Sequence, residues 1–292
     1  MLLNGAHDNE GFAPDALPAT RWERFWDILK NRWLLLCGLS VVLLAFMLPL
    51  AGGTMLLQYL KSADVTALAA GGTQAAGLVL RCFGWDLIAF AVCLAGAAIL
   101  AAGAGGTLYI LQQLAWGEGV IFSLDFPAGI RSSYRGMLCS GCMGCLAALS
   151  VKLNWDFAVY SEETAPLLAV SSALTTAAAF VLVVSAVFVA AQTLNYEVSP
   201  GDSVRNALIL TVAYAPRNLL LALAVCAPVA LVCLGGLLAR AAYLVVMGLF
   251  GFAALGLGVL LYCGHIFDLS INPRTEGARL RRGLYTPPED RP

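Results

Sequence analysis

The segment SPGDSVRNALILTVAYAPRNLLLALAVCAPVALVCLGGLL, residues 199–238, contains the pattern that decides the fold class. Ser199 and Asp202 form a helix start whose side-chain oxygens can accept from the free N–H groups of the first turn. Pro216 is expected to end or kink this helix, because proline has no N–H to donate and its ring clashes with the preceding turn. About twenty residues without a charge follow Asn218, which is enough to cross ~30 Å of hydrocarbon. The segment therefore predicts a short surface helix, a break at a proline and a transmembrane helix.

The composition of the whole chain indicates the same environment. Hydrophobic residues make up 60% of the 292 residues and charged residues 12%, and the mean hydropathy is +0.81. These values exclude an ordinary soluble domain and indicate an integral membrane protein. The N-terminal residues contain no basic region that leads into an apolar run. We therefore expect residues 1–19 to form a disordered, polar cytoplasmic tail rather than a cleaved signal peptide.

The apolar segments predict an all-α polytopic membrane domain over residues 20–271, with a cytoplasmic polar tail at 272–292. Six transmembrane helices are expected, at residues 33–57, 87–113, 136–155, 168–192, 219–238 and 241–266. Residues 58–85, between the first two spans, contain two adjacent glycines and several charges that argue against a further span. We expect this segment to be irregular, with room for a short surface helix.

Amphipathic helices are expected before the first, third and fifth spans. In residues 20–32, two tryptophans, a phenylalanine and a leucine recur at helical spacing, and the tryptophans suit the depth of lipid headgroups. Residues 130–138 carry apolar side chains at i, i+4, i+7 and i+8, with Arg131 and Arg135 on the other face. Together with the helix that starts at Ser199, these helices predict three helical hairpins, each preceded by a cytoplasmic amphipathic helix.

The distribution of basic residues predicts the orientation. If the N-terminus is inside, most of the 17 Lys and Arg residues lie inside, and only Lys61, Arg81, Lys152 and Arg240 lie outside. The positive-inside rule therefore places both termini in the cytoplasm. Cations on the surface helices can bind anionic lipid headgroups, at about 1 kcal/mol per residue, or they can serve only to orient the protein. The candidate lipid- or partner-binding residues are Arg24, Lys30, Arg32, Arg131, Arg135, Arg205 and Arg217.

The nine cysteines indicate no disulfide framework, because most lie inside apolar segments and only Cys82 falls in an expected exterior loop. The CxxCxxC sequence that begins at Cys139 lacks the fourth cysteine of a ferredoxin-type site, so we interpret it as helix packing. A zinc site requires the third and sixth spans to touch, with Cys139, Cys142, Cys263 and His265 as candidate ligands. Ser140 and His265 could form a hydrolase dyad, but Ser140 lies in no nucleophile motif.

The centres of the six expected spans contain no Asp, Glu, Lys or Arg, which argues against an ion-coupled transporter. Hydroxyl groups on the fourth span could line a path for a neutral solute or form hydrogen bonds between helices. These groups belong to Ser171, Ser172, Thr175, Thr176 and Ser185.

Residues 105–135, GGTLYILQQLAWGEGVIFSLDFPAGIRSSYR, combine a small-residue helix, a short acidic turn and an aromatic-rich basic helix that leads into a new span. In this pattern the chain resembles the YesL-like family of bacterial membrane proteins, whose general function is unassigned. Residues 196–221 are similar to that family's second cytoplasmic connector, and Pro49 fits its first hairpin. The insertion at 58–85 and the polar N-terminal tail depart from the family pattern. The resemblance implies a six-helix membrane protein, often linked with carbohydrate uptake systems, and it supplies no catalytic residues.

We therefore expect a non-enzymatic accessory or scaffold protein of the bacterial cytoplasmic (inner) membrane. Its partners would be membrane lipids or subunits of a sugar transporter, with no nucleic acid and no cofactor. The alternative is a permease for a neutral small molecule. A water-accessible cavity lined by hydroxyls of the fourth span would favour the permease, and a dry, packed bundle would favour the scaffold. An intramembrane enzyme is the third hypothesis.

Overall fold

The computed structural model describes residues 17–69, 75–160, 165–234, 236–275 and 280–285, and every regular element in these ranges is helical. The α-helices are α1 (Arg21–Asn31), α2 (Trp33–Ala69), α3 (Ala75–Trp116), α4 (Phe122–Tyr160), α5 (Ala165–Asn195), α6 (Pro200–Ala213), α7 (Ala215–Leu234), α8 (Leu237–Val246) and α9 (Phe252–Ser270). A π-helical turn, Met247–Gly251, joins α8 to α9, and a 3-10 turn, Asn272–Arg274, follows α9.

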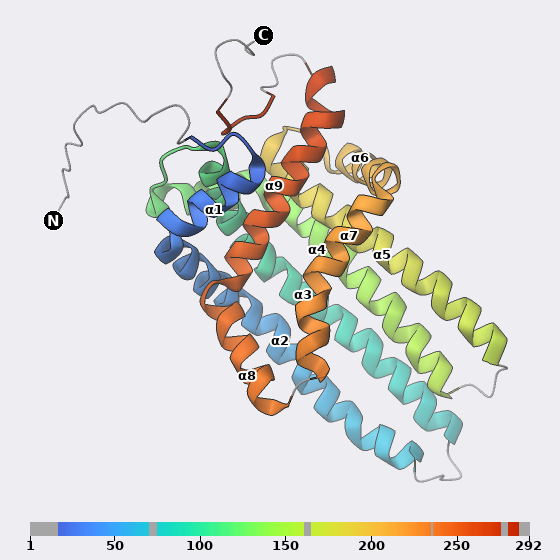
Figure 1. Cartoon of the computed structure of the whole chain (residues 1–292). Helices are drawn as coiled ribbons and strands as arrows, with labels where there is room; N and C mark the ends of the chain where they lie inside the picture. The colour runs from blue at the N-terminus through green and yellow to red at the C-terminus, as the bar shows by residue number, and fades with distance from the viewer. Residues whose placement is uncertain (1–16, 70–74, 161–164, 235, 276–279, 286–292) are drawn as a thin grey trace.

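Helices α2 to α5 are packed as successive antiparallel neighbours, and α9 packs across α3 and α2 (Figure 1). The backbone N–H of Tyr285 donates to the carbonyl of Pro18 at 2.9 Å, so the first and last described segments lie at the same end of the bundle. We call this end the terminal end. The opposite end, where α2 and α4 finish and α3 and α5 begin, is the hairpin end (Figure 1).

Five segments in the described part of the chain are long and apolar enough to cross a membrane. They are Trp33–Leu68, Gly77–Trp116, Phe122–Ala158, Pro166–Asn195 and Leu238–Arg274. The pair formed by α6 and α7 is bent by 91° and gives a sixth segment if it is counted as one broken span. The expectation of an all-helical chain with several spans is therefore confirmed in its coarse form.

The segment at 58–85 differs from the sequence-based expectation, because α2 continues to Ala69 and α3 begins at Ala75. Its charged residues do not break the helices, since they are paired with one another or with neighbouring helices, as described below. Cys82, expected in an exterior loop, instead lies on α3 with its side chain fully buried. The expected exterior loop is thus wrong in its described part, and residues 70–74 lie outside the described residues.

The three expected surface helices also differ from one another. Residues 20–32 and 199–213 form the separate helices α1 and α6, but residues 130–138 are part of the continuous helix α4. The helix expected at residues 130–138 is therefore present, as the first part of a helix that continues through the third span. The amphipathic pattern is real, and it continues directly into the apolar part of the same helix because nothing between Tyr134 and Cys139 interrupts the backbone hydrogen bonds.

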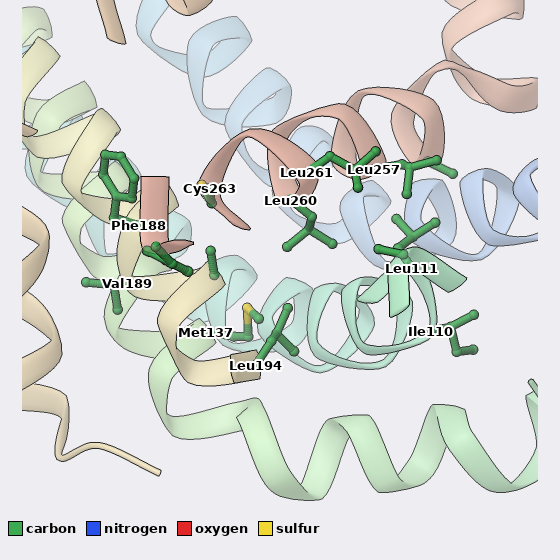
Figure 2. Packing of buried hydrophobic residues seen from close by; sticks show 14 of the residues in the cluster. Ile110, Leu111, Met137, Phe188, Val189, Leu194, Leu257, Leu260, Leu261 and Cys263 are labelled. Atoms are coloured by element: carbon green, nitrogen blue, oxygen red, sulfur yellow. The ribbon is translucent and has the colours of Figure 1, made fainter. Parts of the chain in front are cut away.

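The most tightly packed core lies towards the terminal end. Its buried side chains come mainly from α3, α4, α5 and α9, with two residues each from α2 and α6 and one from α1. Figure 2 shows Phe188 and Val189 of α5 near Cys263 of α9, and Leu111 of α3 near Leu257. This core fixes the helices that surround the polar cavity described below.

Small residues on α3 allow close packing, as their sequence predicted. A Cβ atom at Gly103 would lie 2.4 Å from the ring of Phe46, and one at Gly106 would lie 2.5 Å from the ring of Phe126. Both separations are far below van der Waals contact, so these sites admit no side chain without a shift of the neighbouring helix. The interpretation of the glycine- and alanine-rich segment as a packing surface is confirmed at these positions.

Candidate functional site

Six of the seven candidate basic residues are exposed at or near the terminal end. Within the described part of the chain, none of the six has an ion pair with an acidic side chain. They are Lys30, Arg32, Arg131, Arg135, Arg205 and Arg217. Arg217 lies with its guanidinium 5.8 Å from the ring centre of Tyr214, and this contact leaves its N–H groups free to bind an anion.

Arg24 differs from the other six because its side chain is only 14% exposed. Its Nη1 lies 3.0 Å from Oδ2 of Asp27, and its Nη2 donates to the carbonyl of Leu114 at 2.7 Å. The second bond ties α1 to the C-terminal turn of α3, where the Leu114 carbonyl also accepts from the N–H of Gly117. Arg24 therefore joins two helices instead of belonging to the exposed basic surface.

Helix α1 has the features of an interfacial helix. The Thr20 side chain accepts from the N–H of Glu23, and the Glu23 carboxylate accepts from the N–H of Ala19 at 2.8 Å and of Thr20. These hydrogen bonds, the one from Ala19 above all, lower the pKa of Glu23. Ile28 is buried against the bundle, whereas three tryptophans on and next to α1 are exposed, as expected at headgroup depth. They are Trp22, Trp26 and Trp33.

The junction of α6 and α7 is built as the sequence predicted. The Ser199 side chain caps α6 by accepting from the N–H of Asp202, and α6 ends at Ala213, just before Pro216. The buried amide of Asn218 holds the bend, since its Nδ2 donates to the carbonyl of Thr211 at 3.0 Å and Tyr262 donates to its Oδ1 at 2.7 Å. Asn218 thus satisfies a carbonyl left free where α6 ends and attaches the corner to α9.

A polar cavity of about 750 Å³ opens at the terminal end. Its walls come from α3, α5 and α9, with the segment after α5, the start of α1 and residues of the C-terminal segment at its rim. Gln112 of α3 and Gln192 of α5 reach it from within the apolar bundle, and both side chains are at least 96% buried. Tyr196 donates to Oδ1 of Asn272 at its edge, and burial, together with the charge of Asp268, raises the pKa of this phenol.

Two ion pairs frame this cavity. Arg21 of α1 reaches past Gly264 to place its Nη2 2.6 Å from Oδ2 of Asp268 on α9. Arg282 pairs with Glu118, and its guanidinium lies over the Trp116 ring at 3.5 Å from the ring centre. The described part of the C-terminal tail is therefore packed onto the bundle at the mouth of the cavity.

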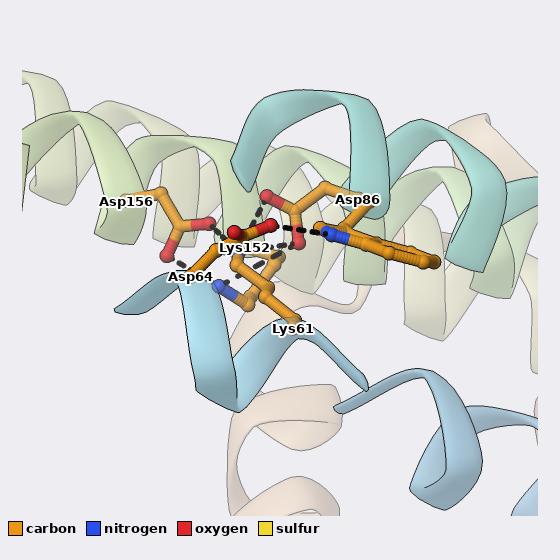
Figure 3. Close-up of polar contacts among 6 residues, drawn as sticks. Lys61, Asp64, Asp86, Lys152 and Asp156 are labelled. Carbon is orange, nitrogen blue, oxygen red and sulfur yellow. Dashed lines mark hydrogen bonds and ion pairs between the residues drawn. The ribbon is translucent and has the colours of Figure 1, made fainter. Parts of the chain in front are cut away.

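A second polar group, at the hairpin end, was missed by the sequence reasoning (Figure 3). Lys61 of α2 is held by both oxygens of Asp86 on α3 at 2.8 Å and by Oδ2 of Asp156 on α4 at 2.7 Å. Lys152 pairs with Asp156 and lies 3.8 Å from Asp86. We call these four residues the charge cluster. A small apolar pocket of about 280 Å³ lies beside it.

A further pair extends the charge cluster towards the tip of the first hairpin. Asp64 of α2 accepts from Arg81 and from the indole N–H of Trp85, both at 3.0 Å. The signal for these contacts was present in the sequence: Asp86 and Asp156 lie next to the ends of the expected spans at 87 and 155, close to cations of neighbouring helix ends. Two lysines and two aspartates cancel in charge, so the charge cluster is best explained as a link between three helices.

The structure does not assemble the candidate zinc ligands. Cys263 is fully buried in the core, whereas His265 is exposed on the other side of α9. Among the described residues, no group of three or more His, Cys, Asp or Glu side chains is arranged to hold a metal ion, which contradicts the zinc hypothesis for Cys139, Cys142, Cys263 and His265. Ser140 donates to the carbonyl of Ala186 at 2.8 Å, so its hydroxyl serves in packing of α4 on α5.

Two of the five hydroxyls expected on the fourth span form hydrogen bonds to other helices. The Ser185 hydroxyl lies 2.9 Å from that of Thr211 on α6, and Ser172 accepts from Asn154 of α4 at 3.0 Å. Ser171 and Thr176 donate to backbone carbonyls of their own helix. None of these hydroxyl residues lines the polar cavity. The structure thus favours the interpretation as contacts between helices for Ser172 and Ser185.

The length and hydropathy of the helices define a multi-pass membrane protein. No protein-family model matches the chain, and no curated protein or solved structure is detectably similar to it. The resemblance to the YesL-like family therefore stays a prediction from the residues at 105–135 and 196–221.

Proposed function

We propose that the protein is a non-enzymatic scaffold of the bacterial cytoplasmic membrane that binds anionic lipid through its terminal end. In this proposal six spans cross the membrane, with α7 as the fifth, and both termini lie in the cytoplasm. The exposed, unpaired cations named above carry the proposal, because they share one end of the bundle with an interfacial helix rich in tryptophan. Docking of transporter subunits on this lipid-covered face is the expectation that follows from the family resemblance.

The absence of acidic partners among the described residues supports lipid binding by these exposed cations over a role in orientation alone. A cation that only sets orientation gains nothing from remaining unpaired, whereas an anionic headgroup needs N–H groups that no carboxylate already occupies. Arg205 lies on an exposed face of α6, next to the exposed apolar residues Leu208 and Ile209. Apolar contact with lipid chains and charge contact with headgroups are therefore available on the same helix.

The test compares two variants that each lose two positive charges. Arg205→Gln with Arg217→Gln changes the terminal end, and Arg81→Gln with Lys152→Gln changes the hairpin end. Native mass spectrometry of the full chain would count retained phosphatidylglycerol against phosphatidylcholine. We expect the first variant to lose about 2 kcal/mol of binding, roughly a thirtyfold weaker affinity, and the second to retain its lipid. Equal retention by both variants would leave these arginines as signals for orientation only.

The hydroxyls of the fourth span do not favour the neutral-solute permease over the scaffold. Ser172 and Ser185 of α5 bond to other helices, and none of the five hydroxyl residues lines the polar cavity or the small pocket at the hairpin end. Uptake of a solute by vesicles containing only this protein would reverse this preference.

A further inference from the structure

The polar cavity contains hydrogen-bonding groups that the described protein atoms leave without partners. Nε2 of Gln192 is buried and has no acceptor, and Oε1 of Gln112 is buried and has no donor. Nε of Arg21, which also borders the cavity, has no acceptor. Buried polar atoms are normally hydrogen-bonded, and leaving one unpaired costs free energy. Two amides beside one cavity, each with one unpaired buried atom, therefore indicate that something else binds there.

Taken together, the partners of these three atoms must include both acceptors and a donor. Gln192 and Arg21 need an acceptor, while Gln112 needs a donor. A hydroxyl group supplies both functions, and it can pair with either end of an amide. Several neighbouring hydroxyls on one small molecule would satisfy all three atoms at once.

The charges around the cavity indicate a ligand without net charge. Arg21 is already neutralised by Asp268 at 2.6 Å, and Arg282 is paired with Glu118. Glu197 remains, and its side chain is exposed to solvent at the rim. A charged ligand would lose hydration on entering this partly enclosed site without gaining an uncommitted counter-charge inside it.

We infer that this cavity binds a small, uncharged polyhydroxylated solute through Gln112, Gln192 and Arg21. This site is distinct from the exposed cations and does not depend on their binding anionic lipid. The cavity volume of about 750 Å³ leaves room for a molecule of this kind together with water. The Gln112 amide is held in place, since Asn195 accepts from Nε2 of Gln112 at 3.2 Å and so directs its Oε1 away from that bond.

Binding is tested with the full chain in phosphatidylcholine nanodiscs, which lack anionic lipid. Saturation-transfer NMR would be measured with glycerol, sorbitol and myo-inositol, and with gluconate as the charged counterpart of sorbitol. We expect saturable signals from at least one neutral polyol and affinity about tenfold weaker for gluconate than for sorbitol. Empty nanodiscs give the background. Absence of a saturable signal from all three polyols would overturn the inference and leave the cavity filled by water alone.

Two matched variants separate binding from packing. Gln192→Met keeps the length of the side chain but removes its hydrogen bonds, and we expect polyol binding to weaken about tenfold. Its thermal midpoint should be unchanged or higher without ligand, because an unpaired buried amide is removed. Gln113→Met is the control, since Oε1 of Gln113 is also buried without a partner but Gln113 does not line the cavity. Equal weakening in both variants would contradict the proposed site.

A second variant keeps the test decisive if Gln192→Met does not fold. Gln112→Met removes the unpaired acceptor from the opposite wall and is expected to weaken polyol binding by a similar factor. Unchanged binding in a folded Gln112→Met protein would exclude the proposed role of these amides.

Discussion

The two ends of the bundle differ in how many of their cations stay unpaired, although Arg21, Arg24 and Arg282 at the terminal end also have acidic partners. At the hairpin end, Lys61, Arg81 and Lys152 are each paired with an aspartate. At the terminal end, six candidate cations are exposed and, among the described residues, have no acidic partner. The same residue types therefore serve two purposes: the paired cations join helices, and the unpaired ones remain available to a ligand.

The charge cluster needs pairing because its side chains are buried between helices, although it lies near the limit of the apolar layer. Lys61 follows Trp33 by 28 residues of one helix, which corresponds to about 42 Å. The hydrocarbon core is ~30 Å thick, so the charge cluster lies at or beyond the far headgroups when Trp33 is at the near ones. Pairing allows α2, α3 and α4 to remain helical and packed past the limit of the apolar layer.

The largest effect is expected from Lys61→Met. This change leaves the carboxylates of Asp86 and Asp156 buried without their main partner, and we expect the free energy of unfolding to fall by about 3–5 kcal/mol. Unfolding in mixed micelles, followed by circular dichroism, would measure the difference.

Two controls show whether charge or packing is responsible for that loss. Combining Lys61→Met with Asp86→Leu and Asp156→Leu should restore most of the stability, because no unpaired buried carboxylate remains. Lys152→Met should cost about 1 kcal/mol or less, since the Lys152 side chain is 41% exposed. If Lys61→Met and Lys152→Met were equally destabilising, burial would not be the deciding factor.

A smaller effect is expected from Arg24→Gln at the terminal end. The change removes the bond to the Leu114 carbonyl and the pair with Asp27, which we expect to lower the free energy of unfolding by about 1–3 kcal/mol. Arg32→Gln, at an exposed position nearby, should stay within about 0.5 kcal/mol of the native protein. Equal changes in the free energy of unfolding would show that Arg24 stabilises the fold no more than an exposed cation does.

A local effect of pH is expected on the first turn of α1. The pKa of Glu23 in the folded chain lies below its ordinary value of 4.5. Its contribution to stability is therefore fully present above pH 4.5 and is lost as the pH falls through the lower, folded pKa. Hydrogen exchange of residues 20–31 should show this loss of protection in the native protein and not in Glu23→Gln. The same pH dependence in both proteins would assign it to another group.

The smallest effect on stability is expected from Arg131→Gln with Arg135→Gln. Both side chains are exposed, so the free energy of unfolding should change by no more than about 0.5 kcal/mol. Retention of phosphatidylglycerol should nevertheless fall, and the difference from the native protein should shrink at high salt because exposed charges are screened. A large loss of stability would show that these arginines also join helices.

Local sequence features predicted much of the fold. The start of α6 at Ser199, its end just before Pro216 and the close packing at Gly103 and Gly106 follow from the properties of single residues. The continuous helices through residues 58–69 and 75–85 did not follow, because Lys61 and Asp64 count against a span when each charge is considered alone. Their cost is removed by partners on other helices, and such pairing is a property of the tertiary structure.

The candidate site was predictable only in its exposed part. Arg131 and Arg135 were placed on an outer helix face by the periodicity of their neighbours, and the structure agrees. The polar cavity depends on Gln112 and Gln192, which are amides near the ends of apolar runs and lie 80 residues apart in sequence. A signal existed, since each lies near the end of an expected span that finishes on the same side of the membrane. The contact between those two ends could not be derived from either segment alone.

The arrangement of the charge cluster has a consequence for biogenesis. In the proposed orientation, the tips of the hairpins α2–α3 and α4–α5 must be translocated across the bilayer during synthesis. Lys61 has its partner Asp86 within the first hairpin, and Lys152 has Asp156 four residues away within the second. Each hairpin tip can therefore be translocated with these charges already neutralised. The bond between Lys61 and Asp156 joins the two hairpins, so it can form only after both have been inserted. This bond would therefore stabilise the packed bundle only at the end of assembly.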